Sequence, residues 1–141
     1  MALDPRSLPG DALAWLAQHR YATLTTLRPD GSPHVVPVAM TYDPATATAR
    51  VLARRHSVKA ANVRAGSPAV LCEVDGGRWL TLEGEARVTD HPAALAEAER
   101  RYAERFRAPT PNPERVVLEI SVTRCLGARQ LTRPPVVPSA E

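Results

Sequence analysis

Apolar and polar residues alternate along several stretches of the chain, and this pattern predicts mainly β structure. Residues 116–123 are the clearest example, because every second side chain there is a large aliphatic one. Residues 78–89 show a similar alternation, with aliphatic residues mainly on one face and polar residues on the other. One buried and one solvated face is typical of antiparallel sheet. Further strands are expected over residues 21–27, 34–42, 50–53 and 69–74.

Three helices are predicted to flank or separate these strands. The first covers residues 11–18 and has a short apolar face. The second covers residues 58–65, with Ser57 as its N-cap and Gly66 just beyond its end. The third follows Asp90, which we expect to cap it, and runs to about residue 106 with apolar side chains at helical spacing.

Turn residues predict how the strands connect. Residues 28–32 read RPDGS, a strong turn signal, so the strands on either side should pair as a hairpin. Pro37 in the second of these strands cannot donate a ladder hydrogen bond, which indicates a sheet edge or a bulge. Because the connections are short, the sheet should be mainly antiparallel, and closure into a barrel would remove its edges.

The pattern predicts one mainly β (α+β) domain over residues 1–127 and no second domain. Residues 128–141 contain three prolines and show no packing pattern. We expect this tail to be extended or disordered, or to lie across a partner subunit. No internal repeat occurs in the sequence.

The composition is that of an ordinary globular protein, with 44% hydrophobic and 23% charged residues in 141. No apolar run approaches the ~20 residues that a membrane-spanning helix needs. The first ten residues lack the pattern of a secretory signal, so we expect a cytoplasmic protein. Cys72 and Cys125 each lie in an apolar, strand-like run. They are expected to be buried free thiols, although their number also allows one disulfide.

The basic residues do not point to nucleic acid. The sequence pI is about 9.3, but the net charge is only +3 and aromatic residues make up 4%. A protein that binds single strands combines basic groups with many stacking aromatics. Lys59 is the only lysine among 18 basic residues. A lysine kept in such an arginine-rich chain is a candidate for a specific role, with retention by chance as the alternative.

The start of the second predicted helix carries an unusual concentration of positive charge. Arg54, Arg55 and His56 precede Ser57, and Lys59 follows, while no acidic residue lies between residues 51 and 66. A helix N-terminus is itself partly positive, so each cation there is unfavourable by about 0.3–1 kcal/mol unless an anion joins it. A bound phosphate would resolve this conflict, because it would take backbone N–H groups, the Ser57 hydroxyl and bidentate arginine contacts together. The alternative is a solvated basic patch without a ligand.

Other site chemistries find little support. The four histidines are far apart in sequence and have no cysteine or carboxylate at metal-ligand spacing. The nucleophile elbow, the Gly-x-Gly-x-x-Gly fingerprint and the P-loop are absent. We therefore expect no bound metal and no catalytic acid, base or nucleophile. A phosphate site, if present, should use none of these known nucleotide-binding motifs.

Three segments resemble one known family. Residues 22–38 (ATLTTLRPDGSPHVVPV) are similar to the opening hairpin of the pyridoxamine 5′-phosphate oxidase-like split β-barrels, which bind FMN or coenzyme F420. Residues 59–70 (KAANVRAGSPAV) resemble the family's Lys-x-x-Asn-Leu helix and the strand that follows. Residues 84–86 (GEA) resemble a Gly-x-Ala element in a later strand. In this order and spacing the match extends from about residue 13 to residue 126.

The resemblance implies a six-stranded antiparallel split β-barrel with short flanking helices, acting as a homodimer with its cofactor at the subunit interface. It implies that Lys59 contacts the cofactor phosphate and that Asn62 supports the loop around it. It also implies the positions of further cofactor-binding residues: Arg54 and Arg55 near the phosphate or ribityl chain, Pro37, Val38 and Ala53 near the ring, and Trp79 approaching from the partner. Two positions depart from the family: Ser57 stands where relatives often have Arg, and Ala128 where they often have Trp.

The compact length favours the F420-using branch of this family. The resemblance then implies an F420-dependent oxidoreductase that transfers a hydride between the deazaflavin and a small conjugated acceptor, such as a quinone, a tetrapyrrole or a nitro compound. An FMN-dependent oxidoreductase of the same fold is an alternative, and so is a non-catalytic flavin- or tetrapyrrole-binding protein. Oxidation of pyridoxamine phosphate is not expected, because the extended C-terminal substrate segment is missing.

Overall fold

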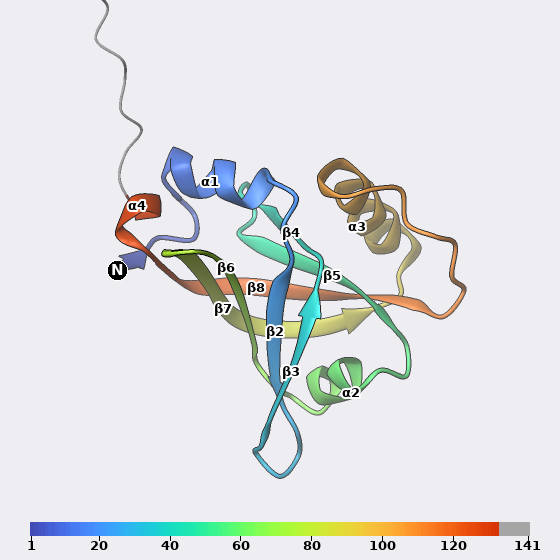
Figure 1. Ribbon diagram of the computed structural model, residues 1–141. Coiled ribbons are helices and arrows are strands. Elements are labelled where there is room, and N and C mark those ends of the chain that lie inside the picture. Colours follow the sequence, from blue (N-terminus) through green and yellow to red (C-terminus); the bar gives the residue numbers. More distant parts are fainter. Residues whose placement is uncertain (133–141) are drawn as a thin grey trace, which may run out of the picture.

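The computed structural model describes residues 1–132, which form one antiparallel sheet flanked by four short helices. The strands are β1 (Ala2–Leu3), β2 (Ala22–Leu27), β3 (Pro33–Val38), β4 (Met40–Asp43), β5 (Thr48–Arg54), β6 (Ala69–Asp75), β7 (Arg78–Thr89) and β8 (Arg115–Gly127). The helices are α1 (Gly10–Ala17), α2 (Val58–Arg64), α3 (Pro92–Arg105) and α4 (Arg129–Thr132). Figure 1 shows the strands curving around a common interior, with the helices at the periphery.

The order of hydrogen-bonded strands is β3-β2-β6-β7-β8-β5-β4, and β1 pairs with β8. Its two ends, β3 and β4, are consecutive in the chain, which is the arrangement of a split barrel. The predicted antiparallel, mainly β fold is therefore confirmed. Pro37 lies in β3, an outer strand of this order, as the missing N–H donor required.

The number of strands differs from the six that were expected, because the described residues form eight. The return strand predicted over residues 34–42 is interrupted at Ala39, and its halves pair with different neighbours. The first half, β3, pairs with β2, whereas β4 pairs with β5. The pair Ala2–Leu3 adds the remaining strand on β8. The division of the return strand follows from this change of pairing partner, and the added strand β1 depends on pairing with a strand distant in sequence.

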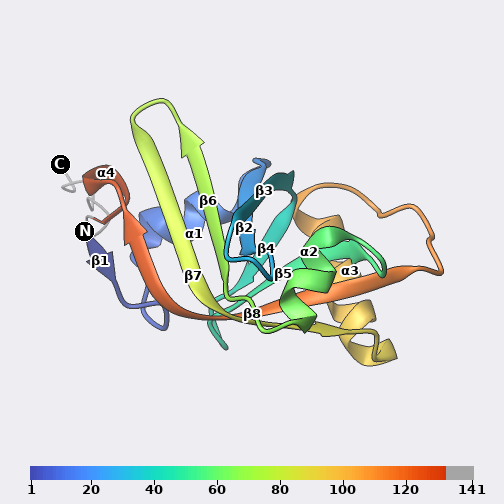
Figure 2. The same cartoon turned by 90° about the horizontal axis from the view of Figure 1, so that it is seen from below.

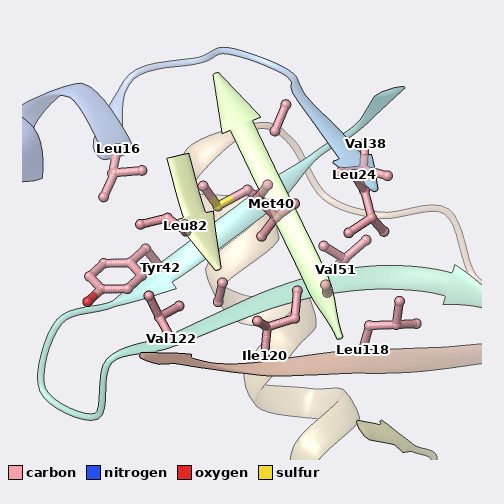
Figure 3. Close-up of a cluster of buried hydrophobic side chains, with 14 of the residues drawn as sticks. Leu16, Leu24, Val38, Met40, Tyr42, Val51, Leu82, Leu118, Ile120 and Val122 are labelled. Atoms are coloured by element: carbon pink, nitrogen blue, oxygen red, sulfur yellow. The ribbon is translucent and has the colours of Figure 1, made fainter. Parts of the chain in front are cut away.

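Aliphatic side chains from both halves of the split sheet fill the interior. Figure 3 shows Leu24, Met40, Val51 and Ile120 gathered between the strands, and all of them are almost fully buried. At Gly84 the backbone of β7 lies close to that of β8. A Cβ atom at this position would stand 1.9 Å from the Ser121 carbonyl oxygen, so only glycine permits this approach.

The local signals around α2 are confirmed. The Ser57 side chain accepts a hydrogen bond from the Ala60 amide at 3.3 Å, which makes Ser57 the N-cap. Gly66 adopts a φ of 100°, a left-handed conformation that favours glycine after a helix. The cap thus fixes where α2 begins, shortly after β5, and Gly66 marks where it ends.

The predicted cap of α3 is wrong. His91 caps this helix, because its Nδ1 atom accepts a hydrogen bond from the Ala93 amide at 3.2 Å. The Asp90 carboxylate instead bonds the Arg55 guanidinium at 3.0 Å. An ionic partner distant in sequence has taken the side chain that a local rule assigned to the cap.

The C-terminal tail departs from expectation where it can be followed. Residues 129–132 form the helix α4 instead of an extended segment, and Leu131 is buried. This leucine joins the main hydrophobic cluster, which explains why the chain turns back onto the sheet. The rest of the predicted tail, residues 133–141, lies outside the described residues.

The thiols and the lengths of the helices complete the description of the fold. Cys72 and Cys125 are both free, as expected; Cys125 is buried and Cys72 is half-buried. No helix within residues 1–132 is long and apolar enough to cross a membrane.

A buried ion pair fastens the end of α3 to the sheet. The Arg105 guanidinium contacts the Glu73 carboxylate of β6 at 2.6 Å, and both side chains are at most 4% exposed. The same guanidinium donates to the carbonyl oxygens of Met40 at 2.7 Å and Gln18 at 2.8 Å. Burial raises the pKa of Glu73, while Arg105 acts in the opposite direction. One side chain thus connects α3 with β6, β4 and the end of α1.

We predict that Arg105→Met lowers the free energy of unfolding by about 3–5 kcal/mol, because it leaves the Glu73 carboxylate buried without a partner. Urea unfolding followed by circular dichroism measures this loss. Arg100→Met is the matched control on the same helix, since Arg100 makes exposed ion pairs with Glu97 and Glu104. It should leave the midpoint nearly unchanged. Equal shifts for both variants would contradict the assigned role of Arg105.

Candidate functional site

A pocket of about 650 Å³ opens where β5 leads into α2. One wall comes from the junction of β3 and β4 together with the end of β5. The other comes from the end of α3 and the segment that follows it. Figure 2 shows α2, β5 and this segment on the same side of the molecule, away from the β6–β7 hairpin. The lining residues are Pro37, Val38, Ala39, Leu52, Ala53, Arg54, Ser57, Lys59, Tyr102, Arg107, Pro109, Thr110, Pro111, Asn112 and Arg115.

Six of the nine residues predicted to bind a cofactor line this pocket: Pro37, Val38, Ala53, Arg54, Ser57 and Lys59. A tight turn brings the polar members together. The Arg54 carbonyl oxygen accepts hydrogen bonds from the Ser57 amide at 3.1 Å and from the Ser57 hydroxyl at 2.8 Å. This turn and the cap of α2 direct Arg54 and Lys59 to one cavity.

Arg55 is predicted at the site but does not line the pocket. Its guanidinium lies 3.0 Å from the Asp90 carboxylate and 3.6 Å from that of Glu114. Glu114 also lies 3.9 Å from the His56 ring nitrogen. No acidic residue occurs within residues 51–66, but Asp90 and Glu114, from later in the chain, balance part of the positive charge of that segment.

Asn62 and Trp79 are likewise absent from the pocket lining. Asn62 is buried and donates a hydrogen bond to the Thr26 hydroxyl at 3.0 Å. It thereby attaches α2 to β2, which is a supporting role. Trp79 lies at the start of β7, beside the hairpin turn and opposite Val74 of β6. Its predicted approach from a partner subunit stays a prediction.

Within the basic segment 54–59, Arg54 and Lys59 carry the positive charge that no described acidic residue balances. Neither has an acidic partner within residues 1–132, and Arg54 is exposed while Lys59 is half-buried. Burial, followed by the nearby Arg54 charge, holds the pKa of Lys59 below its usual value. A bound anion would stabilise the charged form of this ammonium group. Arg54 and Lys59 are therefore the residues of this segment that we expect to contact a negatively charged ligand.

Sequence reasoning missed the wall that follows α3. Tyr102, Arg107 and Arg115 line the pocket together with the proline-rich segment 109–112. Arg115 is held in place by the Glu99 carboxylate at 3.1 Å and by the Thr110 carbonyl. Arg107 is exposed and has no acidic partner in the described chain. The prolines signalled a loop, but no local motif placed that loop opposite α2.

The described lining thus contains four basic side chains and no acidic one, beside an apolar surface from Pro37, Val38, Leu52 and Ala53. This combination suits a ligand with an apolar ring and several negative charges. Within residues 1–132 no group of three potential metal ligands occurs.

The chain is similar to known proteins along most of its length. The family model described as pyridoxamine 5′-phosphate oxidase matches residues 8–127. An F420H2-dependent biliverdin reductase from Mycobacterium tuberculosis is 52% identical over 124 residues, which cover 88% of this chain and 90% of the relative. This relative is similar along nearly its whole length.

Solved structures share the fold at lower identity. A conserved hypothetical protein from Mycobacterium tuberculosis superposes with a TM-score of 0.73 at 22% identity, covering 95% of this chain and 94% of its own. A structure named F420 reductase gives a TM-score of 0.66 at 21% identity, covering 80% of this chain and 94% of its own. The family model spans most of the chain, and the fold agrees along its length. The chain belongs to the pyridoxamine 5′-phosphate oxidase family.

Proposed function

We propose that this protein is an F420-dependent oxidoreductase that transfers a hydride to a small conjugated acceptor. The observation that carries the proposal is the pocket lined by four cations, no acid and an apolar wall. The 52% identical relative, named for F420H2-dependent biliverdin reduction, supports the same cofactor. Biliverdin, a tetrapyrrole, is accordingly the first acceptor to test.

The residues of the pocket fit such a cofactor in two parts. Arg54 and Lys59 would hold the phosphate, because these two cations lack acidic partners within residues 1–132 and both line the pocket. Ser57, whose hydroxyl donates to the Arg54 carbonyl oxygen, fixes the turn between them. Pro37 and Ala53 would contact the ring. Arg115 extends the positive charge to the facing wall, which suits the acidic tail of F420.

When bound, the reduced deazaflavin supplies a hydride, and the acceptor gains that hydride and one proton, so that two electrons pass to it. The chain's own residues provide position, electrostatics and exclusion of water. The Asn62–Thr26 hydrogen bond fixes α2 against β2 and so keeps Lys59 at the pocket. No carboxylate or cysteine lines the described pocket, which fits chemistry performed by a cofactor.

FMN is the alternative cofactor, and a non-catalytic flavin- or tetrapyrrole-binding protein is the alternative function. FMN carries one phosphate and no acidic tail, so it leaves Arg115 on the facing wall without an anionic ligand group to contact. F420 therefore matches the charge of the pocket better. Titration of the protein with F420 and with FMN, followed by fluorescence, separates the cofactors, and turnover of biliverdin by F420H2 separates an enzyme from a binding protein.

We also propose that two copies pair through the outer face of β2, β3, β6 and β7. Strand register places Thr25 opposite both Val35 and Val70, and Val74 opposite Trp79, on this face. Val35 is 56% and Val74 is 64% exposed. A partner on this face would bring a second Trp79 toward Pro37, which lies at the face and at the pocket. The free thiols agree with a cytoplasmic location.

Lys59→Ala should weaken F420 binding by about 2–5 kcal/mol, the range typical of removing one member of a buried charge pair. Stability should change little, because a cation at a helix start is mildly unfavourable. Fluorescence titration measures the affinity. Arg100→Ala, which removes an exposed cation outside the pocket lining, is the control and should bind F420 like the parent. Equal affinity in Lys59→Ala and the parent would remove Lys59 from the site.

The affinity for F420 should also depend on pH through Lys59. Because the free protein holds the pKa of Lys59 below its usual value and a bound anion raises it, binding takes up a proton between these two values. Affinity is therefore constant below the free-state pKa and falls as the pH rises through and beyond it. Lys59→Arg keeps its charge and should abolish the decline. A decline of the same size in both proteins would assign it to another group.

A further inference from the structure

Three aromatic side chains and one histidine form a cluster between α3 and the segment that joins α1 to β2. The Tyr21 and Phe106 rings are stacked, with centroids 5.9 Å apart and planes inclined by 11°. The Phe106 ring centroid also lies 5.4 Å from that of Tyr102 and 5.1 Å from that of His19. Figure 1 shows the segment after α1 passing beside the end of α3. In a chain with six Phe, Trp and Tyr residues, three of them meet here.

This cluster, called the aromatic ledge below, is continuous with the pocket. Tyr102 belongs both to the ledge and to the pocket lining, and Arg107, directly after Phe106, lines the pocket too. Tyr21 is 61% exposed, although its side chain is among the largest of the protein. An exposed aromatic surface therefore extends outward from the mouth of a cationic cavity.

The ledge is held in a preformed position. The Arg105 guanidinium lies 5.2 Å from the Phe106 ring centroid and donates to the Gln18 carbonyl, adjacent to His19. Both sides of the ledge are thus attached to the buried contact with Glu73. A rigid aromatic surface binds a flat ligand with little loss of conformational freedom.

Arg107 adds a charge preference to this surface. It is exposed and has no acidic partner among residues 1–132, whereas Arg115 across the pocket is already bonded to Glu99. A flat molecule stacked on Tyr21 with a carboxylate near the pocket mouth would meet this free guanidinium. Guanidinium and carboxylate groups form paired, charge-assisted hydrogen bonds.

We propose that the aromatic ledge and Arg107 form the acceptor subsite, which selects planar conjugated acceptors that carry carboxylate groups. This inference rests on the proposed function, because it places the acceptor beside a cofactor held at Arg54 and Lys59. Tyr21 stacks on the conjugated system, and Arg107 binds a carboxylate. Tyr102, which belongs to both the ledge and the pocket lining, brings the acceptor next to the cofactor, as direct hydride transfer requires.

The experiment compares Tyr21→Ala, Tyr21→Phe and Arg107→Ala with the parent protein. For each protein, the Kd for F420 is measured by fluorescence, and KM and kcat are measured with biliverdin and with menadione, an uncharged quinone. Tyr21→Ala should raise KM for both acceptors by about three- to tenfold, since it removes a stacking surface. Tyr21→Phe keeps the ring and should behave like the parent. Arg107→Ala should raise KM about tenfold or more for biliverdin alone.

Three results would overturn the subsite. The first is an unchanged biliverdin KM in both Tyr21→Ala and Arg107→Ala. The second is a weakened Kd for F420 in Arg107→Ala with no effect on biliverdin, which would assign this residue to the cofactor. The third is dissociation of a parent dimer by Tyr21→Ala in light scattering, which would make Tyr21 a subunit contact.

The ledge and the proposed function fail in different ways. If the parent does not bind F420, the proposed function is wrong. Biliverdin binding to the cofactor-free protein, followed by its absorbance, then tests the ledge by itself. Weaker binding by Tyr21→Ala and Arg107→Ala, with parent-like binding by Tyr21→Phe, supports it, and equal binding by all four proteins overturns it.

Discussion

The contact between Glu73 and Arg105 determines where one wall of the pocket stands. It joins the end of α3 to β6, and through two backbone carbonyl oxygens also to β4 and α1. The segment that follows Arg105 supplies Arg107 and residues 109–112 to the pocket. A buried ion pair adds little net stability because both charges lose their hydration. Its effect here is positional: the guanidinium can satisfy its acceptors only with α3 in this place.

Charge balance connects this architecture with ligand binding. The chain concentrates cations between β5 and α2, and the fold then neutralises some of them and leaves others unpaired. Asp90 and Glu114 bind Arg55, whereas Arg54 and Lys59 have no acidic partner in the described residues and line the cavity. An unpaired, half-buried ammonium group is costly without an anion. Of the two neighbouring arginines, Arg55 is thus neutralised by ion pairs within the fold, whereas Arg54 stays available to a ligand in the cavity.

Local sequence signals predicted much of the fold. The cap at Ser57, the terminator at Gly66 and the edge position of Pro37 depend on a few neighbouring residues, and the structure confirms them. Predictions were wrong where a distant partner competed with a local rule. Asp90 left its expected cap position for Arg55, and Leu131 drew the start of the tail into a helix against the core. Both outcomes depend on contacts that no short window of sequence contains.

By itself the sequence determined the antiparallel β class, because hydrophobic alternation and turn residues are local signals, and through the family resemblance it identified six of the residues that line the cavity. Only the tertiary structure decided that the return strand divides at Ala39, that Arg55 is neutralised, and that the segment after α3 closes the pocket. The physical reason is that ion pairs and burial act between residues far apart in sequence. Their energies depend on distances that exist only after the chain has folded.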